Sequence, residues 1–181
     1  MRDLLFLLPV GGIKRLRTAD LAAVSIPAVV TIEVLVNSYE KPKNTRPIRV
    51  FVTCSDTEIE LKFFHARIEW VRSILPENSK RIISGKIERF ASGLQMVHPD
   101  YIVSSDKIGT IPDFEPIYPL SRGISQKLMI KTVRQAHDKN QSFSEWIDRS
   151  IMKKFAWPSF NVAIKKAHNP TDMKEIEPKY G

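Results

Sequence analysis

Between Arg46 and Tyr101 the sequence repeats strand-like runs in an order that few small folds share. Apolar and polar residues alternate along most of these runs, as expected where one face of a sheet is buried. Ile68, Val71 and Leu75 instead recur at helical spacing, which predicts one helix over residues 66–75. The predicted strands, including one upstream of this stretch, cover residues 30–37, 48–52, 58–64, 81–90 and 94–98.

The predicted order is therefore three strands, a helix and two further strands. This order is typical of the OB-fold, a five-stranded, partly open barrel whose faces and loops bind oligonucleotides or oligosaccharides. We predict a mainly β chain with flanking helices, in which a five-stranded OB-fold barrel covers residues 28–103. A helical N-terminal lead-in and linker would occupy residues 1–27. An extended, proline-punctuated strap and a C-terminal helical connector would occupy residues 104–181.

Short helices are predicted at both ends of the chain. Residues 2–8 have the character of a helix that Pro9 and the following glycines end. Near the C-terminus three serines precede runs with helical spacing, and serine is a favoured helix N-cap. We expect Ser125, Ser144 and Ser159 to cap three successive helices.

The composition favours a negatively charged partner. Lysine and arginine number 28 against 20 acidic residues, which gives a net charge of +8. Such a surplus favours nucleic acid first and an anionic membrane surface second. No stretch approaches the ~20 apolar residues of a membrane span, so we expect a cytosolic protein. The single cysteine, Cys54, precludes an internal disulfide and suits a reducing, cytoplasmic compartment.

The sequence offers no catalytic or metal site. The tripeptide Ser84-Gly85-Lys86 lacks the earlier glycine and the following hydroxyl of a phosphate-binding loop. The four histidines are far apart, without the spacing of a metal site. Cys54 has no neighbouring base and is interpreted as a turn residue between two strands. We therefore expect these residues to form no enzyme.

Binding is better supported, beginning with Phe64. This aromatic residue lies on what should be the solvent-exposed face of the third strand, beside Lys62 and shortly before Arg67. Aromatic rings stack on bases, and neighbouring cations contact phosphates. The pattern equally allows Phe64 to pack against the C-terminal helices. Phe63 is assigned to the core, and Trp70 is expected to plug the barrel or pack against the strap.

Two other segments add similar residues. The fourth strand carries Lys86, Arg89 and Phe90. The loop between the first two strands is one of the usual binding loops of an OB barrel. Its basic residues are Lys41, Lys43 and Arg46.

Short motifs occur in a consistent order along nearly the whole chain. The most specific is Gly85-Lys86-Ile87-Glu88, followed by residues 94–101 (Leu-Gln-Met-Val-His-Pro-Asp-Tyr) and by Tyr118-Pro119-Leu120. Further matching segments cover residues 3–6, 8–9, 46–50, 61–64, 116–117, 157–160 and 168–170. In these segments the sequence resembles the wedge region of the RecG-type ATP-dependent DNA helicases, which remodel stalled replication forks and Holliday junctions.

The resemblance implies an OB-fold that grips the branch point of DNA during repair and recombination. It assigns base stacking at the junction to Phe64, with Phe63 a weaker candidate. Some relatives carry a second stacking aromatic residue four positions later, where this chain has Ile68. The resemblance does not extend to a helicase motor, so ATP and Mg²⁺ are expected in the parent helicase and no cofactor in this fragment. It further implies a bacterial, nucleoid-associated monomer that meets branched DNA and a single-stranded-DNA-binding protein.

Two alternatives follow from the residues alone. The chain could be a generic OB module that binds single-stranded DNA or RNA, or an OB module that binds other proteins. A wedge should prefer a fork to a plain single strand, whereas a generic single-strand-binding module should not. A wedge should also lose DNA affinity when Phe64 is replaced, whereas a protein-binding module should not.

Overall fold

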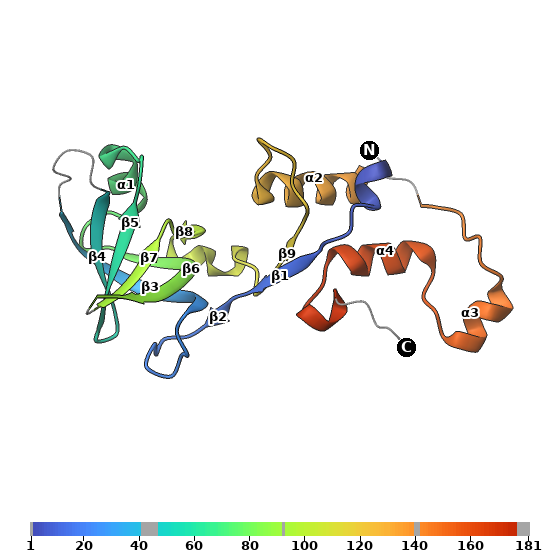
Figure 1. Cartoon of the computed structure of the whole chain (residues 1–181), viewed down its shortest axis with the longest axis horizontal. Coiled ribbons are helices and arrows are strands. Elements are labelled where there is room, and N and C mark those ends of the chain that lie inside the picture. Colours follow the sequence, from blue (N-terminus) through green and yellow to red (C-terminus); the bar gives the residue numbers. More distant parts are fainter. Residues whose placement is uncertain (1, 41–46, 92, 140–141, 177–181) are drawn as a thin grey trace. The chain divides into compact units, whose positions relative to one another are not determined.

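The computed structural model describes residues 2–40, 47–91, 93–139 and 142–176 (Figure 1). The chain divides into two compact units, which we call the barrel unit (residues 15–113) and the helical unit (residues 1–14 and 114–181). The barrel unit also contains α1 (Ile68–Ile74) and a 3-10 helix, η2 (Ser105–Thr110). Its strands are β2 (Leu16–Arg17), β3 (Ala28–Glu40), β4 (Ile48–Cys54), β5 (Thr57–Phe63), β6 (Lys80–Phe90), β7 (Gly93–Val97) and β8 (Tyr101–Val103).

The barrel closes because β3 is long enough to pair with two strands. Its first part pairs with β6 from Ala28 to Leu35, and its last part pairs with β4 from Leu35 to Glu40. The ring continues from β4 through β5 and β7 to β6, with β5 and β7 parallel and the other pairs antiparallel. The predicted five-stranded OB-fold, with its helix between the third and fourth barrel strands, is confirmed.

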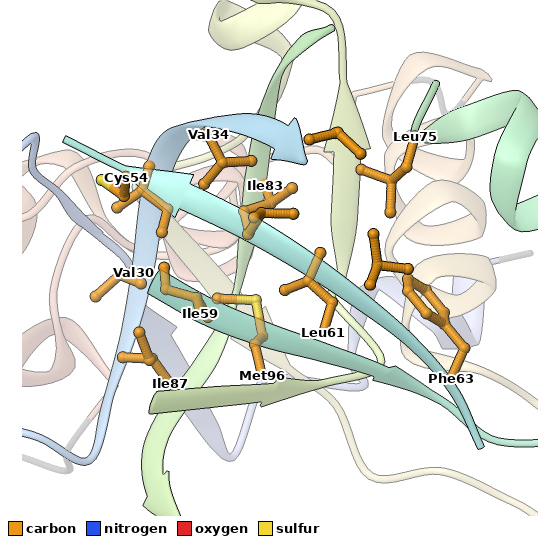
Figure 2. Close-up of a cluster of buried hydrophobic side chains, with 14 of the residues drawn as sticks. Val30, Val34, Cys54, Ile59, Leu61, Phe63, Leu75, Ile83, Ile87 and Met96 are labelled. Atoms are coloured by element: carbon orange, nitrogen blue, oxygen red, sulfur yellow. The ribbon is translucent and has the colours of Figure 1, made fainter. Parts of the chain in front are cut away.

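Alternation along the strands builds the barrel core (Figure 2). In β4 every second residue is buried, and in β5 the side chains of Ile59 and Leu61 are fully buried. Figure 2 shows these side chains converging with Ile83 and Met96 inside the barrel. At Gly85 a Cβ atom would lie 2.9 Å from Met96 Sδ, so glycine lets β6 pass close to this side chain.

The helical unit has smaller clusters of buried residues. Its elements are η1 (Arg2–Leu5), β1 (Gly11–Lys14), β9 (Phe114–Ile117), α2 (Gln126–Lys139), α3 (Arg149–Phe155), α4 (Phe160–His168) and η3 (Met173–Glu175). One face of α2 packs Met129, Ile130 and Val133 with Tyr118. The Tyr118 hydroxyl donates to Nδ1 of His168 over 2.9 Å, while Nε2 of His168 donates to the Leu5 carbonyl over 2.8 Å. None of the described helices is long and apolar enough to cross a membrane.

Several local predictions were wrong. Cys54 is buried as the last residue of β4, because the polar turn is confined to the two residues after it. The predicted strap is not wholly extended, because it contains η2 and because β9 pairs with β1. The N-terminal helix is only the single 3-10 turn of η1.

Of the three predicted serine caps, only the one at Ser125 is confirmed by a capping hydrogen bond. Ser125 Oγ accepts a hydrogen bond from the Leu128 N–H over 3.2 Å and so caps α2 as predicted. Ser144 caps no helix, because α3 begins later and Asp148 accepts the Ser150 N–H over 2.7 Å. Ser159 occupies the N-cap position of α4, but its side chain makes no capping hydrogen bond.

Candidate nucleic-acid interface

Phe64 follows directly after the last residue of β5, where the chain bends away from the sheet. Its side chain is 43% exposed, whereas the preceding Phe63 is 2% exposed. The Phe64 ring lies against the imidazole of His98, with centroids 5.8 Å apart and an interplanar angle of 37°. The two adjacent phenylalanines therefore do different things, one filling the core and one presenting a ring to solvent.

Phe63 connects the surrounding rings. Its ring meets those of Trp70 and His98 edge to face, with centroid distances of 6.2 and 6.0 Å. Trp70 lies on α1 and is 52% exposed. The prediction that it plugs the barrel or is buried against the strap was therefore wrong. We call Phe63, Phe64, Trp70 and His98 the aromatic end of the barrel unit. The buried Phe63 ring contacts Trp70 and His98 directly, and Phe64 is linked to it through His98.

Of the predicted cations, Arg67 lies in sequence between two members of the aromatic end, Phe64 and Trp70. It is the N-cap residue of α1, three residues after Phe64, and its side chain is exposed. Within the described residues Arg67 makes no ion pair, so its charge is available to a ligand.

Lys62 has a different environment on the outer face of the sheet. It is only 8% exposed, and its Nζ donates to Gln95 Oε1 over 2.6 Å and lies 3.5 Å from Glu60 Oε2. The same ammonium lies 4.4 Å from the centroid of the Phe90 ring, which is 60% exposed. A cation in such a site is held by its neighbours in the fold.

These contacts continue across the strands as a series of polar pairs. Gln95 Nε2 donates to Glu88 Oε1 over 2.9 Å, and Lys86 Nζ lies 3.4 Å from Glu88 Oε2. The hydrogen bond from Gln95, followed by that from Lys86, lowers the pKa of Glu88. Arg49 ion-pairs with both Glu60, at 2.5 Å, and Glu40, at 2.8 Å. We call this set the polar ladder; its members are Glu40, Arg49, Glu60, Lys62, Lys86, Glu88 and Gln95.

The other predicted residues divide into two groups. Arg89 is exposed on β6 and makes no ion pair among the described residues. Lys41, Lys43 and Arg46 lie outside the described residues. The structure thus places Lys62 and Lys86 on the polar ladder, with the Phe90 ring against Lys62, and leaves Phe64 and Arg67 at the aromatic end.

Charge is distributed unevenly between the two units. The barrel unit contains 14 basic and 12 acidic residues, and the helical unit 14 and 8. Their net charges are therefore +2 and +6. The positive charge that favours a polyanionic partner lies mostly outside the barrel.

A groove of about 660 Å³ lies elsewhere on the barrel unit. It is lined by residues from β3 and from the end of β4, and by Lys80 and Arg17 among others. None of the predicted site residues that the structure describes lines it. Among the residues that the structure describes there is also no group of three or more His, Cys, Asp or Glu side chains that could hold a metal ion.

Sequence reasoning missed two members of the aromatic end. His98 was quoted only as part of a motif, and Trp70 was assigned to packing. The signal for His98 was its place as the last residue of the fifth predicted strand, which pairs with β5 in the structure. Trp70 falls on the polar side of α1, away from its buried Val71, which is a signal for exposure.

Known proteins share both the sequence and the fold. The chain is 28% identical over 173 residues to the ATP-dependent DNA helicase RecG of Aquifex aeolicus (strain VF5), covering 88% of this chain and 21% of the helicase. It is 30% identical over 139 residues to the RecG of Pasteurella multocida (strain Pm70), covering 75% and 20%. The chain thus spans about a fifth of the length of these curated relatives.

A solved structure described as RecG bound to a three-way DNA junction matches 97% of this chain and 24% of that chain. The TM-score is 0.67 at 20% identity, which supports the shared fold. The family described as the RecG wedge domain matches residues 1–139, more than three quarters of the sequence. This chain therefore belongs to the RecG wedge domain family.

Proposed function

We propose that this chain binds branched DNA, as the wedge of a RecG-like helicase that remodels replication forks and Holliday junctions. The observation that carries the proposal is Phe64, a half-exposed ring held at the end of a barrel strand. The resemblance of this sequence to the RecG wedge region assigns base stacking at the junction to this position. A solved relative of the same fold is described as bound to a three-way DNA junction.

The stacking surface fits the flat face of an unpaired base. Phe64 offers an aromatic face that is already backed by His98, and Trp70 offers a second exposed ring next to the buried Phe63. Stacking on an aromatic side chain contributes roughly 1–3 kcal/mol per base and tolerates any sequence. A protein that recognises the shape of a fork needs contacts of this kind.

Phosphate contacts are assigned to the exposed cations. Arg67 at the aromatic end and Arg89 on β6 have no acidic partner in the described part of the chain. Lys62 and Lys86 remain candidates, but each already interacts with a carboxylate of the polar ladder. We therefore expect a smaller contribution to DNA affinity from the ladder lysines. Lys41, Lys43 and Arg46 complete the proposed set.

ATP hydrolysis is not assigned to these 181 residues, because their sequence contains no phosphate-binding loop. In the proposal they supply the DNA-splitting surface, and motor function belongs to the helicase as a whole. The relatives named above are ATP-dependent DNA helicases of about four times this length.

The test compares fluorescence anisotropy of a labelled three-way fork with that of a single strand of equal length, at several salt concentrations. The chain should prefer the fork at each concentration. Phe64→Ala should weaken fork binding by about 1–3 kcal/mol while leaving the salt dependence unchanged. Phe155→Ala removes a similarly exposed ring from α3 and should change neither.

Two outcomes would favour other functions. Equal affinity for fork and single strand would indicate a generic OB module that binds single strands. DNA affinity that is unaffected by Phe64→Ala would instead favour a protein-interaction module.

A further inference from the structure

We infer that His98 is a positioning residue that fixes the Phe64 ring in the orientation required for stacking, an inference that rests on the proposed function. The resemblance assigns a role to Phe64 and none to His98. The structure links them by a hydrogen bond and a ring contact.

The hydrogen bond joins the Phe64 backbone to the His98 side chain. The Phe64 N–H donates to His98 Nε2 over 3.0 Å. Because Nε2 accepts this bond, the imidazole is neutral and carries its proton on Nδ1. The His98 N–H in turn donates to the Lys62 carbonyl over 2.9 Å. His98 is therefore tied to the chain immediately before and immediately after Phe63.

Backbone geometry explains why a side chain makes this bond. β5 and β7 are parallel and in register from Ile59 opposite Leu94 to Lys62 opposite Val97. If the ladder continued, the Phe64 N–H would donate to the carbonyl of His98. His98 instead has a left-handed φ of 46°, which ends the ladder. Its imidazole takes the place of the carbonyl as the acceptor.

The ring contacts add orientation to this attachment. The imidazole meets Phe63 nearly at right angles, at 83°, and lies against Phe64 at 37°. One side chain thus contacts the buried ring and the exposed ring together. Holding a ring before the ligand arrives reduces the entropy lost on binding.

His98 is itself solvent-exposed, so its loss leaves no cavity. A purely structural residue would act mainly on stability, whereas a positioning residue should act through Phe64. The structural and the positioning role can be separated by removing the hydrogen-bond acceptor and the ring of His98 one at a time. His98→Gln keeps a hydrogen-bond acceptor and removes the ring, and His98→Phe keeps a ring and removes the acceptor. Both variants must adopt the same positive φ.

The first measurement needs no DNA. In the ¹⁵N-labelled full chain, the hydrogen bond should give a scalar coupling between the Phe64 amide nitrogen and His98 Nε2 in the NMR spectrum. His98→Phe should abolish the coupling and speed hydrogen exchange at the Phe64 amide. Absence of the coupling in the unsubstituted chain would overturn the inference and leave the role proposed for Phe64 standing.

The second measurement is fork binding in a double-mutant cycle with Phe64→Ala. Each His98 variant should weaken fork binding about two- to tenfold, as expected for one lost hydrogen bond or ring contact. In the Phe64→Ala background the same substitutions should have no further effect.

Equal losses in both backgrounds would overturn the inference, because His98 would then act without Phe64. Unchanged affinity in both His98 variants would overturn it as well. If the coupling is present and Phe64→Ala leaves fork binding unchanged, the proposed function is wrong. The inference then falls with it, because there is no stacking contact to position.

Discussion

The polar ladder and the aromatic end lie on the same barrel and use similar residue types, but their side chains have different partners. On the ladder, Lys62 and Lys86 interact with Glu60 and Glu88, and Lys62 lies beneath Phe90. At the aromatic end, Phe64 and Trp70 are exposed, and Arg67 makes no ion pair among the described residues. We therefore expect cations beside aromatic rings to mark a binding surface only where acidic side chains have not already neutralised them.

The largest expected effect is on stability, when the buried ring that supports the aromatic end is removed. Phe63→Ala deletes a buried ring that contacts both Trp70 and His98. It should lower the free energy of unfolding by about 3–5 kcal/mol, measured by urea denaturation. Phe90→Ala, which removes an exposed ring that lies against Lys62 of the ladder, is the control and should cost less than ~1 kcal/mol. Equal losses would contradict the distinction between the two regions.

The next prediction concerns the ladder itself. Lys62→Met keeps the apolar stem over Phe90 but leaves Gln95 Oε1, on a buried side chain, without its donor. The free energy of unfolding should fall by about 1–3 kcal/mol, with little change in fork affinity. Lys80→Met, at the exposed pair with Glu33, should cost less than ~1 kcal/mol. A large loss of fork affinity without loss of stability would make Lys62 a DNA contact instead.

Salt dependence should separate the exposed cation from a paired one. Arg67→Gln should reduce the slope of log affinity against log salt concentration for fork binding by about 0.9, the value of one phosphate contact. Lys86→Gln should reduce it by less, because Glu88 already neutralises part of the Lys86 charge. Anisotropy titrations at four or more salt concentrations measure both slopes. The reverse ranking would place the phosphate contacts on the ladder.

The smallest effect is a pH dependence of the ladder. Folding lowers the pKa of Glu88 through its bonds to Gln95 and Lys86, so the ionised carboxylate stabilises the folded state. This contribution is present above the ordinary pKa of a glutamate and is lost as the pH falls through the lower folded value. Urea midpoints of the natural chain and of Glu88→Gln should differ near neutral pH and converge under acid. A constant difference would show that Glu88 acts through packing alone.

The barrel could be predicted from the sequence because alternation and helical spacing report burial directly. Ile59, Leu61 and Phe63 have the period of a buried strand face, and all three are buried. Cys54 was misassigned because its small side chain fits either a strand end or a turn. The pairing of β1 with β9 joins segments a hundred residues apart, and short strands of that kind carry little local signal.

The site was only partly predictable for a related reason. Phe64 was identifiable because a large ring broke the alternation of its strand. The partners of Lys62 were not, since Glu60 and Gln95 reach it only through the register of β5 and β7. His98 acts on Phe64 because of a left-handed backbone angle that nothing in the local sequence specified.

The chain enters and leaves the barrel unit through two paired strands, with Lys14 of β1 opposite Phe114 of β9. A Cβ at Gly12 would lie 2.0 Å from the Phe114 ring, so glycine allows the two strands to pack tightly. Any tension on the barrel is carried along both backbones in the same direction. The hydrogen bonds between the two strands lie across that direction and so are neither sheared nor unzipped.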